Sequence, residues 1–180
     1  MPKTIETGRV RLAEWDDRHR AAFMDLHADP EVMADLGGPV DREESRCKFE
    51  RYRAALSEYG VSRWAVERKD GVFLGYAGVM PRMSPDHPLG CHFEIGWRLA
   101  RMAWGYGYAT ESAGAALTHA VDVVGLTEIL SYTSAENFRS QAVIAKLGLE
   151  RRPSLDFVLK DQKVGDWHGM VWSFRARAND

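Results

Sequence analysis

The stretch that decides the fold runs Arg101-Met102-Ala103-Trp104-Gly105-Tyr106-Gly107-Tyr108-Ala109-Thr110-Glu111. It joins a strand-like run, residues 93–99, to a helical run of small residues that starts near Gly105. Two glycines at a strand-to-helix turn let the backbone come close to a ligand, and the first turn of a helix offers unpaired N–H groups. Those donors and the positive end of the helix dipole suit a pyrophosphate, so the segment predicts an anion site for a phosphate-bearing cofactor.

Residues that are missing from this segment narrow the choice of ligand. A dinucleotide-binding fingerprint requires glycine at position 110, where this chain has threonine. A Walker A loop ends in Gly-Lys-Ser/Thr, a triplet that the sequence does not contain. Short glycine motifs are common, so the alternative interpretation is that Gly105 and Gly107 only let a helix pack closely on a sheet.

Composition and charge are those of an ordinary globular protein. The 180 residues are enough for a substantial core, and we predict a single domain over residues 1–180. The net charge of −2 gives no support for binding to nucleic acid or to an anionic membrane, and no apolar run is long enough to cross a bilayer. Cys47 and Cys91 have no metal-binding or redox spacing, so we expect a reduced, cytoplasmic protein without a metal.

Hydrophobic periodicity predicts an alternation of strands and helices. Alternating apolar residues indicate a first strand over residues 7–15, and Asp16 and Asp41 are placed to cap the two helices that follow. Asp70-Gly71 is the kind of dipeptide that joins two strands in a tight hairpin. The other predicted elements are strands at 61–68, 72–80, 91–99, 128–132, 157–159 and 170–174, and helices at 105–124 and 137–147. The order β-α-α-β-β-β-α-β-α-β-β predicts a mixed sheet with helices on both faces.

Four spaced motifs resemble those of a known family. They are Glu94-Ile95-Gly96-Trp97, the glycine segment 104–111, Asn137-x-x-Ser140 and Lys146-Leu147-Gly148-Leu149, in that order. The chain resembles the GNAT acyltransferases over most of its length, and it is most similar to the ribosomal-protein N-terminal acetyltransferase (RimJ/RimL-like) branch. The resemblance implies an α/β fold with a central mixed, mostly antiparallel sheet, a splay between two strands and helices on both faces.

The resemblance also implies acetyl-CoA as the cofactor. In the family, the glycine turn binds the pyrophosphate on backbone amides, and the pantetheine arm lies along the preceding strand. Met102 stands where the family often has Gln or Arg, and Arg98 or Arg101 could supply the missing positive charge. The cofactor-binding residues that the resemblance implies are Trp97, Leu99, Met102, Ala103, Trp104, Gly105, Tyr106, Gly107, Tyr108, Ala109, Thr110, Asn137 and Ser140.

Acetyl transfer to an amine needs a base for the ammonium and a proton donor for the leaving thiolate. The resemblance makes Glu94 the candidate general base, acting directly or through a water, with a structural ion pair as the alternative role. Ser140 is the candidate acid, because it shares one helix face with Asn137 three residues earlier. The alternative is that Asn137 caps the helix and Ser140 satisfies its first turn. Tyr132 and Tyr108 are further candidate donors.

The function that follows is acetyl-CoA-dependent N-acetylation of a primary amine, by direct transfer in a ternary complex. The acceptor stays open among a protein N-terminus, an amino acid or peptide, a polyamine and an amine-bearing antibiotic. Glu31, Asp35 and Asp86 lie in the predicted acceptor loops, where carboxylates would attract a cationic acceptor. His92 alternates onto the strand face of Glu94 and is another candidate for the acceptor side.

Other interpretations are consistent with the same residues. A non-catalytic CoA-binding sensor would keep the glycine turn and carry out no chemistry. An unrelated nucleotide-binding domain is disfavoured, because the Walker and dinucleotide signatures are missing. The resemblance to the family also implies a homodimer that forms through the C-terminal strands.

Overall fold

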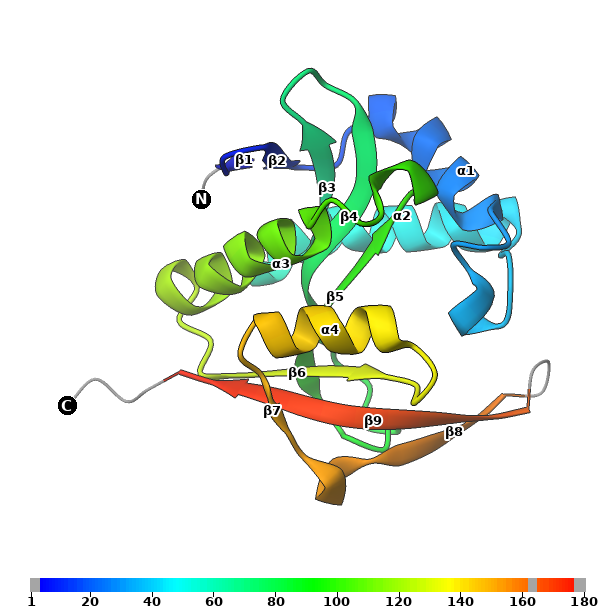
Figure 1. The fold of residues 1–180 in the computed structure, drawn as a ribbon, viewed down its shortest axis with the longest axis vertical. Helices are drawn as coiled ribbons and strands as arrows, with labels where there is room; N and C mark the ends of the chain where they lie inside the picture. Colours follow the sequence, from blue (N-terminus) through cyan, green and yellow to red (C-terminus); the bar gives the residue numbers. More distant parts are fainter. Residues whose placement is uncertain (1–3, 162–164, 177–180) are drawn as a thin grey trace.

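A computed structural model describes residues 4–161 and 165–176, in which nine strands form one sheet flanked by helices (Figure 1). The strand order is β1-β2-β3-β4-β5-β6-β9-β7. β8 lies off this path and pairs with the first five residues of β9, 165–169. Neighbouring strands are antiparallel except β5 and β6, which are parallel. The predicted mixed, mostly antiparallel sheet is therefore confirmed.

The elements follow the predicted order closely. The strands are β1 Thr4–Glu6, β2 Val10–Ala13, β3 Arg63–Arg68, β4 Phe73–Arg82, β5 His92–Leu99, β6 Glu128–Thr133, β7 Glu150–Arg151, β8 Phe157–Asp161 and β9 Gly165–Arg175. The α-helices are α1 Arg20–Ala28, α2 Arg42–Tyr59, α3 Tyr108–Thr118 and α4 Phe138–Lys146. Short 3-10 turns lie at Asp17–His19, Ala34–Leu36, Arg101–Ala103 and Pro153–Leu155, and one π-helical turn, His119–Val123, extends α3.

The predicted first strand, residues 7–15, is wrong at its start: only residues 10–13 form a strand, β2, and residues 7–9 form the turn that joins β2 to β1 in a hairpin. Glu111, in the first turn of α3, holds this turn. Its carboxylate accepts hydrogen bonds from the Thr7 hydroxyl at 2.7 Å and from the Arg9 amide at 2.8 Å. Alternation along the chain cannot reveal a contact with a residue so distant in the sequence.

Helix α3 begins at Tyr108 and not at the predicted Gly105. Gly105 and Gly107 have φ angles of +82° and +81°, in the left-handed region that glycine adopts without strain. The two glycines therefore form the turn between β5 and the helix, and the helix starts only after the second one.

Helices cover both faces of the sheet, as predicted. Alternate residues of β4 point into two separate cores: Ala77 packs in the core that contains Ala113 of α3, and Tyr76 packs in the core that contains Phe23 of α1. Helix α4 joins the first core and α2 joins the second. Among the helices of the described ranges, none has the length and apolar composition needed to cross a membrane.

The parallel strands β5 and β6 position the site. β4 and β5 pair along the whole of β5, from His92 to Leu99. β5 and β6 share one register pair, Glu94 with Leu130. Beyond Ile95, no residue of β5 pairs with the described part of β6. The end of β5 therefore separates from β6, next to the glycine turn and the start of α4.

Candidate active site

A cleft of about 1300 Å³ opens between the end of β5, the glycine turn and α4. Its lining contains most of the residues predicted to hold the cofactor: Trp97, Leu99, Ala103, Trp104, Gly105, Gly107, Tyr108, Ala109, Thr110, Asn137 and Ser140. Met102 and Tyr106 do not line the cleft, and their side chains are 58% and 63% exposed to solvent. The fold thus brings together residues from two segments that are about thirty positions apart in the sequence.

The glycine turn presents backbone N–H groups to this cleft. Within the described structure, none of the amides from Gly105 to Thr110 donates to a backbone carbonyl, and the first such bond of the helix runs from Glu111 N–H to the Gly107 carbonyl, at 3.1 Å. Gly107 is the N-cap residue and offers no side chain to these donors. A row of free amides at the positive end of a helix fits a pyrophosphate.

Arg139 is a cation of this cleft that the sequence analysis missed. Its guanidinium carbon lies 4.2 Å from the centroid of the Trp104 ring, and within the described residues it makes no ion pair. The predicted cations are engaged elsewhere: Arg98 pairs with Asp35, and Arg101 pairs with Glu31, each at 2.8 Å. Arg139 is the second residue of α4, and a positive charge in the first turn of a helix is unfavourable because it opposes the helix dipole. This unfavourable position is the sequence signal that could have identified Arg139.

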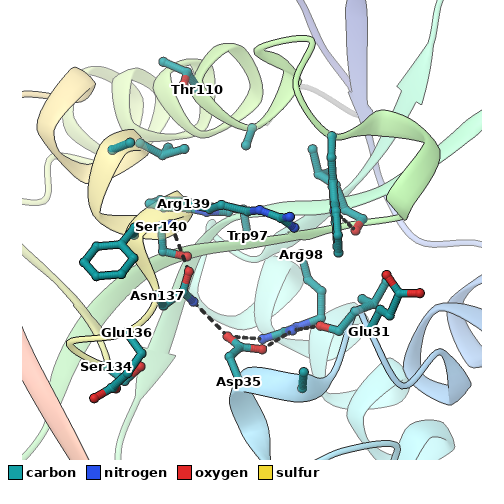
Figure 2. A pocket seen from close by; sticks show the side chains of 18 of the residues that line it. Glu31, Asp35, Trp97, Arg98, Thr110, Ser134, Glu136, Asn137, Arg139 and Ser140 are labelled. Atoms are coloured by element: carbon teal, nitrogen blue, oxygen red, sulfur yellow. Dashed lines mark hydrogen bonds and ion pairs between the residues drawn. The ribbon is translucent and has the colours of Figure 1, made fainter.

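The polar groups of Asn137 are both engaged. Its Oδ1 accepts a hydrogen bond from the Ser140 amide at 3.1 Å, so Asn137 caps α4, as the structural alternative expected. Its Nδ2 donates to Asp35 Oδ2 at 3.1 Å, and Figure 2 shows Asn137 and Arg98 converging on that carboxylate. In contrast, the Ser140 hydroxyl makes no hydrogen bond within the described part of the chain.

A smaller cavity, of about 210 Å³, adjoins the cleft where β5 and β6 separate. It lies between these strands and α2, and Trp97 and Ser140 line both spaces. Glu94 and Tyr132 line the smaller cavity only. The two candidate catalytic residues, Glu94 and Ser140, therefore share one cavity.

Glu94 is buried and held by two arginines. Its Oε1 lies 2.8 Å from Arg63 Nη2, and its Oε2 accepts a hydrogen bond of 2.6 Å from Arg82 Nε. Burial alone would raise the pKa of Glu94, but the charges of Arg63 and Arg82 outweigh it and lower that pKa to about 2. The ion pair expected as the alternative role is present, and it makes this carboxylate a weak base.

Glycine at position 96 gives Arg63 its path to Glu94. A Cβ atom placed on Gly96 would lie only 2.6 Å from Arg63 Nη2 and would displace the guanidinium. Glu94 and Gly96 belong to the same motif, so the motif encodes the carboxylate together with the space for its partner.

Tyr132 is a further titratable residue that lines the smaller cavity. Its hydroxyl lies 3.4 Å from His92 Nε2, while His92 Nδ1 lies 2.8 Å from the Gly90 carbonyl and donates to it. Burial and the charge of Glu94 raise the pKa of Tyr132 above its ordinary value. His92 thus stands behind Tyr132 and does not line the cavity.

The carboxylates predicted to attract a cationic acceptor do not form such a site. Glu31 and Asp35 are paired with arginines, and Asp86 is exposed and lines neither space. Across the described ranges, no three His, Cys, Asp or Glu side chains are grouped as metal ligands would be.

Comparison with known proteins identifies the class. The sequence matches the acetyltransferase (GNAT) domain over residues 9–150. The chain therefore belongs to the GNAT family of acetyltransferases, which use acetyl-CoA, and it is an N-acetyltransferase. The free amides of the glycine turn fit that donor.

One relative supports the same assignment, and two solved structures share the fold. The chain is 32% identical over 152 residues to the FsC-acetyl coenzyme A-N(2)-transacetylase of Aspergillus fumigatus, covering 81% of this chain and 64% of that protein. The crystal structure of an acetyltransferase from Agrobacterium tumefaciens superposes with a TM-score of 0.79 at 24% identity, covering 98% of this chain and 95% of that one. RimL, a ribosomal alpha-N-protein acetyltransferase, superposes with a TM-score of 0.73 at 16% identity, covering 96% and 94%, and shares the fold.

Proposed function

We propose that this enzyme moves an acetyl group directly from acetyl-CoA to a primary amine, in a ternary complex at the junction of the two cavities. The observation that carries the proposal is that Trp97 and Ser140 line both spaces. A thioester at the inner end of the large cleft and an amine in the small cavity would meet beside these two residues. The bound acetyl-CoA supplies the activated acyl carbon, which forms the new C–N bond as the C–S bond breaks.

Glu94 acts in this proposal through a water. A carboxylate with a pKa near 2 does not retain a proton at neutral pH, but it can orient a water that carries the ammonium proton away. The cations around the cavity assist, because nearby positive charge lowers the pKa of an ammonium group.

Ser140 is the proposed proton donor to the leaving thiolate. Its hydroxyl is free of other hydrogen bonds within the described residues, and it lies where the two spaces meet. A thiol has an ordinary pKa of about 8.5, so its thiolate needs only a weak acid. Tyr132 is the second candidate, because its raised pKa keeps its proton in place at neutral pH.

An acetylation assay with a broad amine panel and mass detection tests the proposal. We expect an acetylated amine together with one equivalent of free CoA thiol. Tight acetyl-CoA binding without transfer to any amine would instead identify a CoA-binding sensor. A protein N-terminus as acceptor, the ribosomal-protein branch and a homodimer stay predictions, which the panel and a sedimentation measurement address.

A further inference from the structure

The small cavity is strongly cationic in a chain whose net charge is −2. Five cationic side chains line it against two carboxylates, an excess of three positive charges. The cations are Lys48, Arg51, Arg63, Arg82 and Arg98, and the carboxylates are Asp35 and Glu94. Walls of one charge sign concentrate ligands of the opposite sign in a cleft.

Both carboxylates are already engaged by arginines. Glu94 is shared by Arg63 and Arg82, and Asp35 pairs with Arg98. The two cations of α2 that line the cavity, Lys48 and Arg51, have no ion-pair partner within the described residues. They lie three residues apart and therefore on the same side of the helix.

Two other arginines of α2 have the ion-pair partners that Lys48 and Arg51 lack. Arg46 pairs with Glu43 at 2.6 Å, and Arg53 pairs with Asp17 at 3.3 Å, both at the exposed surface. Lys48 and Arg51 instead line the cavity, with Lys48 half-buried and Arg51 exposed, and both carboxylates of the cavity are occupied by other arginines. Arg46 and Arg53 are thus balanced by carboxylates, whereas neither cation of α2 that lines the cavity has an ion-pair partner within the described residues.

The surroundings of Lys48 disfavour its positive charge. Lys48 is half-buried, and burial lowers its pKa, with Arg51 and Arg98 acting in the same direction. Glu44 and Tyr52 oppose this effect, although Glu44 makes no ion pair with it. Burial would raise the pKa of Tyr52, yet Arg63, Lys48 and Arg82 together hold that pKa below its ordinary value, which reports a positive potential inside the cavity.

We infer that the amine acceptor carries an anionic group, a carboxylate or a phosphate, that binds to Lys48 and Arg51 while its amine lies toward Ser140. This inference rests on the proposed function and names its substrate class. It reverses the expectation of a cationic acceptor. Because the cavity is small, about 210 Å³, we take the acceptor to be a small molecule.

Matched pairs of amines test the inference. Phenylalanine is compared with phenethylamine, γ-aminobutyrate with propylamine, and phosphoethanolamine with ethanolamine, so each pair differs in one anionic group. We expect kcat/KM to be at least about tenfold higher for the anionic member of at least one pair. The first two pairs read the carboxylate and the third reads the phosphate.

Variants locate the effect in the cavity. Lys48→Met and Arg51→Gln remove charge while keeping most of the side-chain length, and each should remove most of the preference for the anionic amine. Lys48→Glu should move the preference toward the neutral-tailed amine. Arg42→Gln is the matched control, because Arg42 is an exposed cation of the same helix that does not line the cavity.

The outcomes separate this inference from the proposed function. Equal rates within every pair, or a preference that persists in both Lys48→Met and Arg51→Gln, would overturn the inference and leave acetyl transfer intact. Faster acetylation of a peptide N-terminus than of any small amine would also overturn it. If no amine is acetylated, the proposed function fails. Thermal stabilisation by the anionic member alone, lost in Lys48→Met, would then still support the anion site, and its absence would reject it.

Discussion

Arg82 Nε donates a 2.6 Å hydrogen bond to Glu94 Oε2, between neighbouring strands and at the wall of the acceptor cavity. Arg63 holds the other carboxylate oxygen from the opposite side. The Glu94 carboxylate is thus ionised over the whole physiological range, and its role depends on the groups around it.

We predict that Glu94→Gln lowers kcat by about 10²-fold or more and leaves the Kd for acetyl-CoA unchanged, because the amide cannot orient the proton-carrying water as the carboxylate does. The substitution also leaves the buried Arg63 and the half-buried Arg82 without their shared partner, which costs up to about 3–5 kcal/mol of stability. Product formation and acetyl-CoA binding are therefore measured together with thermal melts, which report the loss of stability.

Glu67→Gln is the control for that loss of stability. Glu67 is also a buried carboxylate with ion pairs, to Arg11 at 3.3 Å and Arg18 at 3.1 Å, and it lines neither cavity. A similar drop in Tm with normal kcat in Glu67→Gln would assign the loss in Glu94→Gln to the reaction. If Glu94→Gln keeps the wild-type kcat, Glu94 has no part in the mechanism.

Ser140→Ala is expected to lower kcat by roughly 10²-fold, near the lower limit for a general acid, because the thiolate is a good leaving group. The KM values should change little, since the hydroxyl makes no other hydrogen bond within the described residues. Tyr132→Phe, measured in parallel, compares the second candidate donor. A large loss in Tyr132→Phe with normal turnover in Ser140→Ala would exchange the two roles.

Gly105→Ala should raise the KM for acetyl-CoA about tenfold with little change in kcat. Gly105 has a φ of +82° and open space around its Cβ position, so alanine strains the backbone by about 1–2 kcal/mol and turns the amides away from the pyrophosphate. Gly125 has a φ of +81° and equally open space, and it lies outside the cleft. Gly125→Ala should therefore lose similar stability and keep the wild-type KM. Equal KM values in both variants would exclude the turn from cofactor binding.

The parts of the site that sequence could predict are those specified locally. The glycine turn was predictable because left-handed backbone angles require glycine at fixed positions before a helix. Asn137 was predictable as a cap because the cap and its amide partner are three residues apart. The fold class followed from the order of the strands and helices together with the family motifs.

The acceptor cavity was not predictable, because its charges come from distant segments. Lys48 and Arg51 read as solvated residues of an amphipathic helix until packing sets α2 beside Glu94. In the register of β4 and β5, Met80 stands opposite Glu94 and Arg82 stands opposite His92, so Arg82 reaches Glu94 diagonally on the same face. Only the strand register reveals that the candidate base has this partner.

Stability toward acid gives a final prediction, centred on His27. This side chain is fully buried, with Nδ1 3.2 Å from Ser45 Oγ and Nε2 3.2 Å from the Tyr76 hydroxyl. Burial, with help from the charges of Lys48 and Arg98, lowers its pKa from the ordinary 6.5 to about 3. The unfolded chain therefore binds a proton below pH 6.5 that the folded chain does not bind until about pH 3.

The stability that neutral His27 contributes is complete above pH 6.5 and is lost as the pH falls toward about 3. We expect the unfolding free energy of the wild type to decrease by about 1.4 kcal/mol per pH unit in this window from His27 alone. His27→Gln removes the titration, so the difference between the two proteins should narrow steadily as the pH is lowered from 7 to 4.5 in urea melts. Exposed His168 supplies the control variant His168→Gln, which should follow the wild-type slope. Parallel curves for His27→Gln and the wild type would show that His27 titrates in the folded protein near its ordinary pKa.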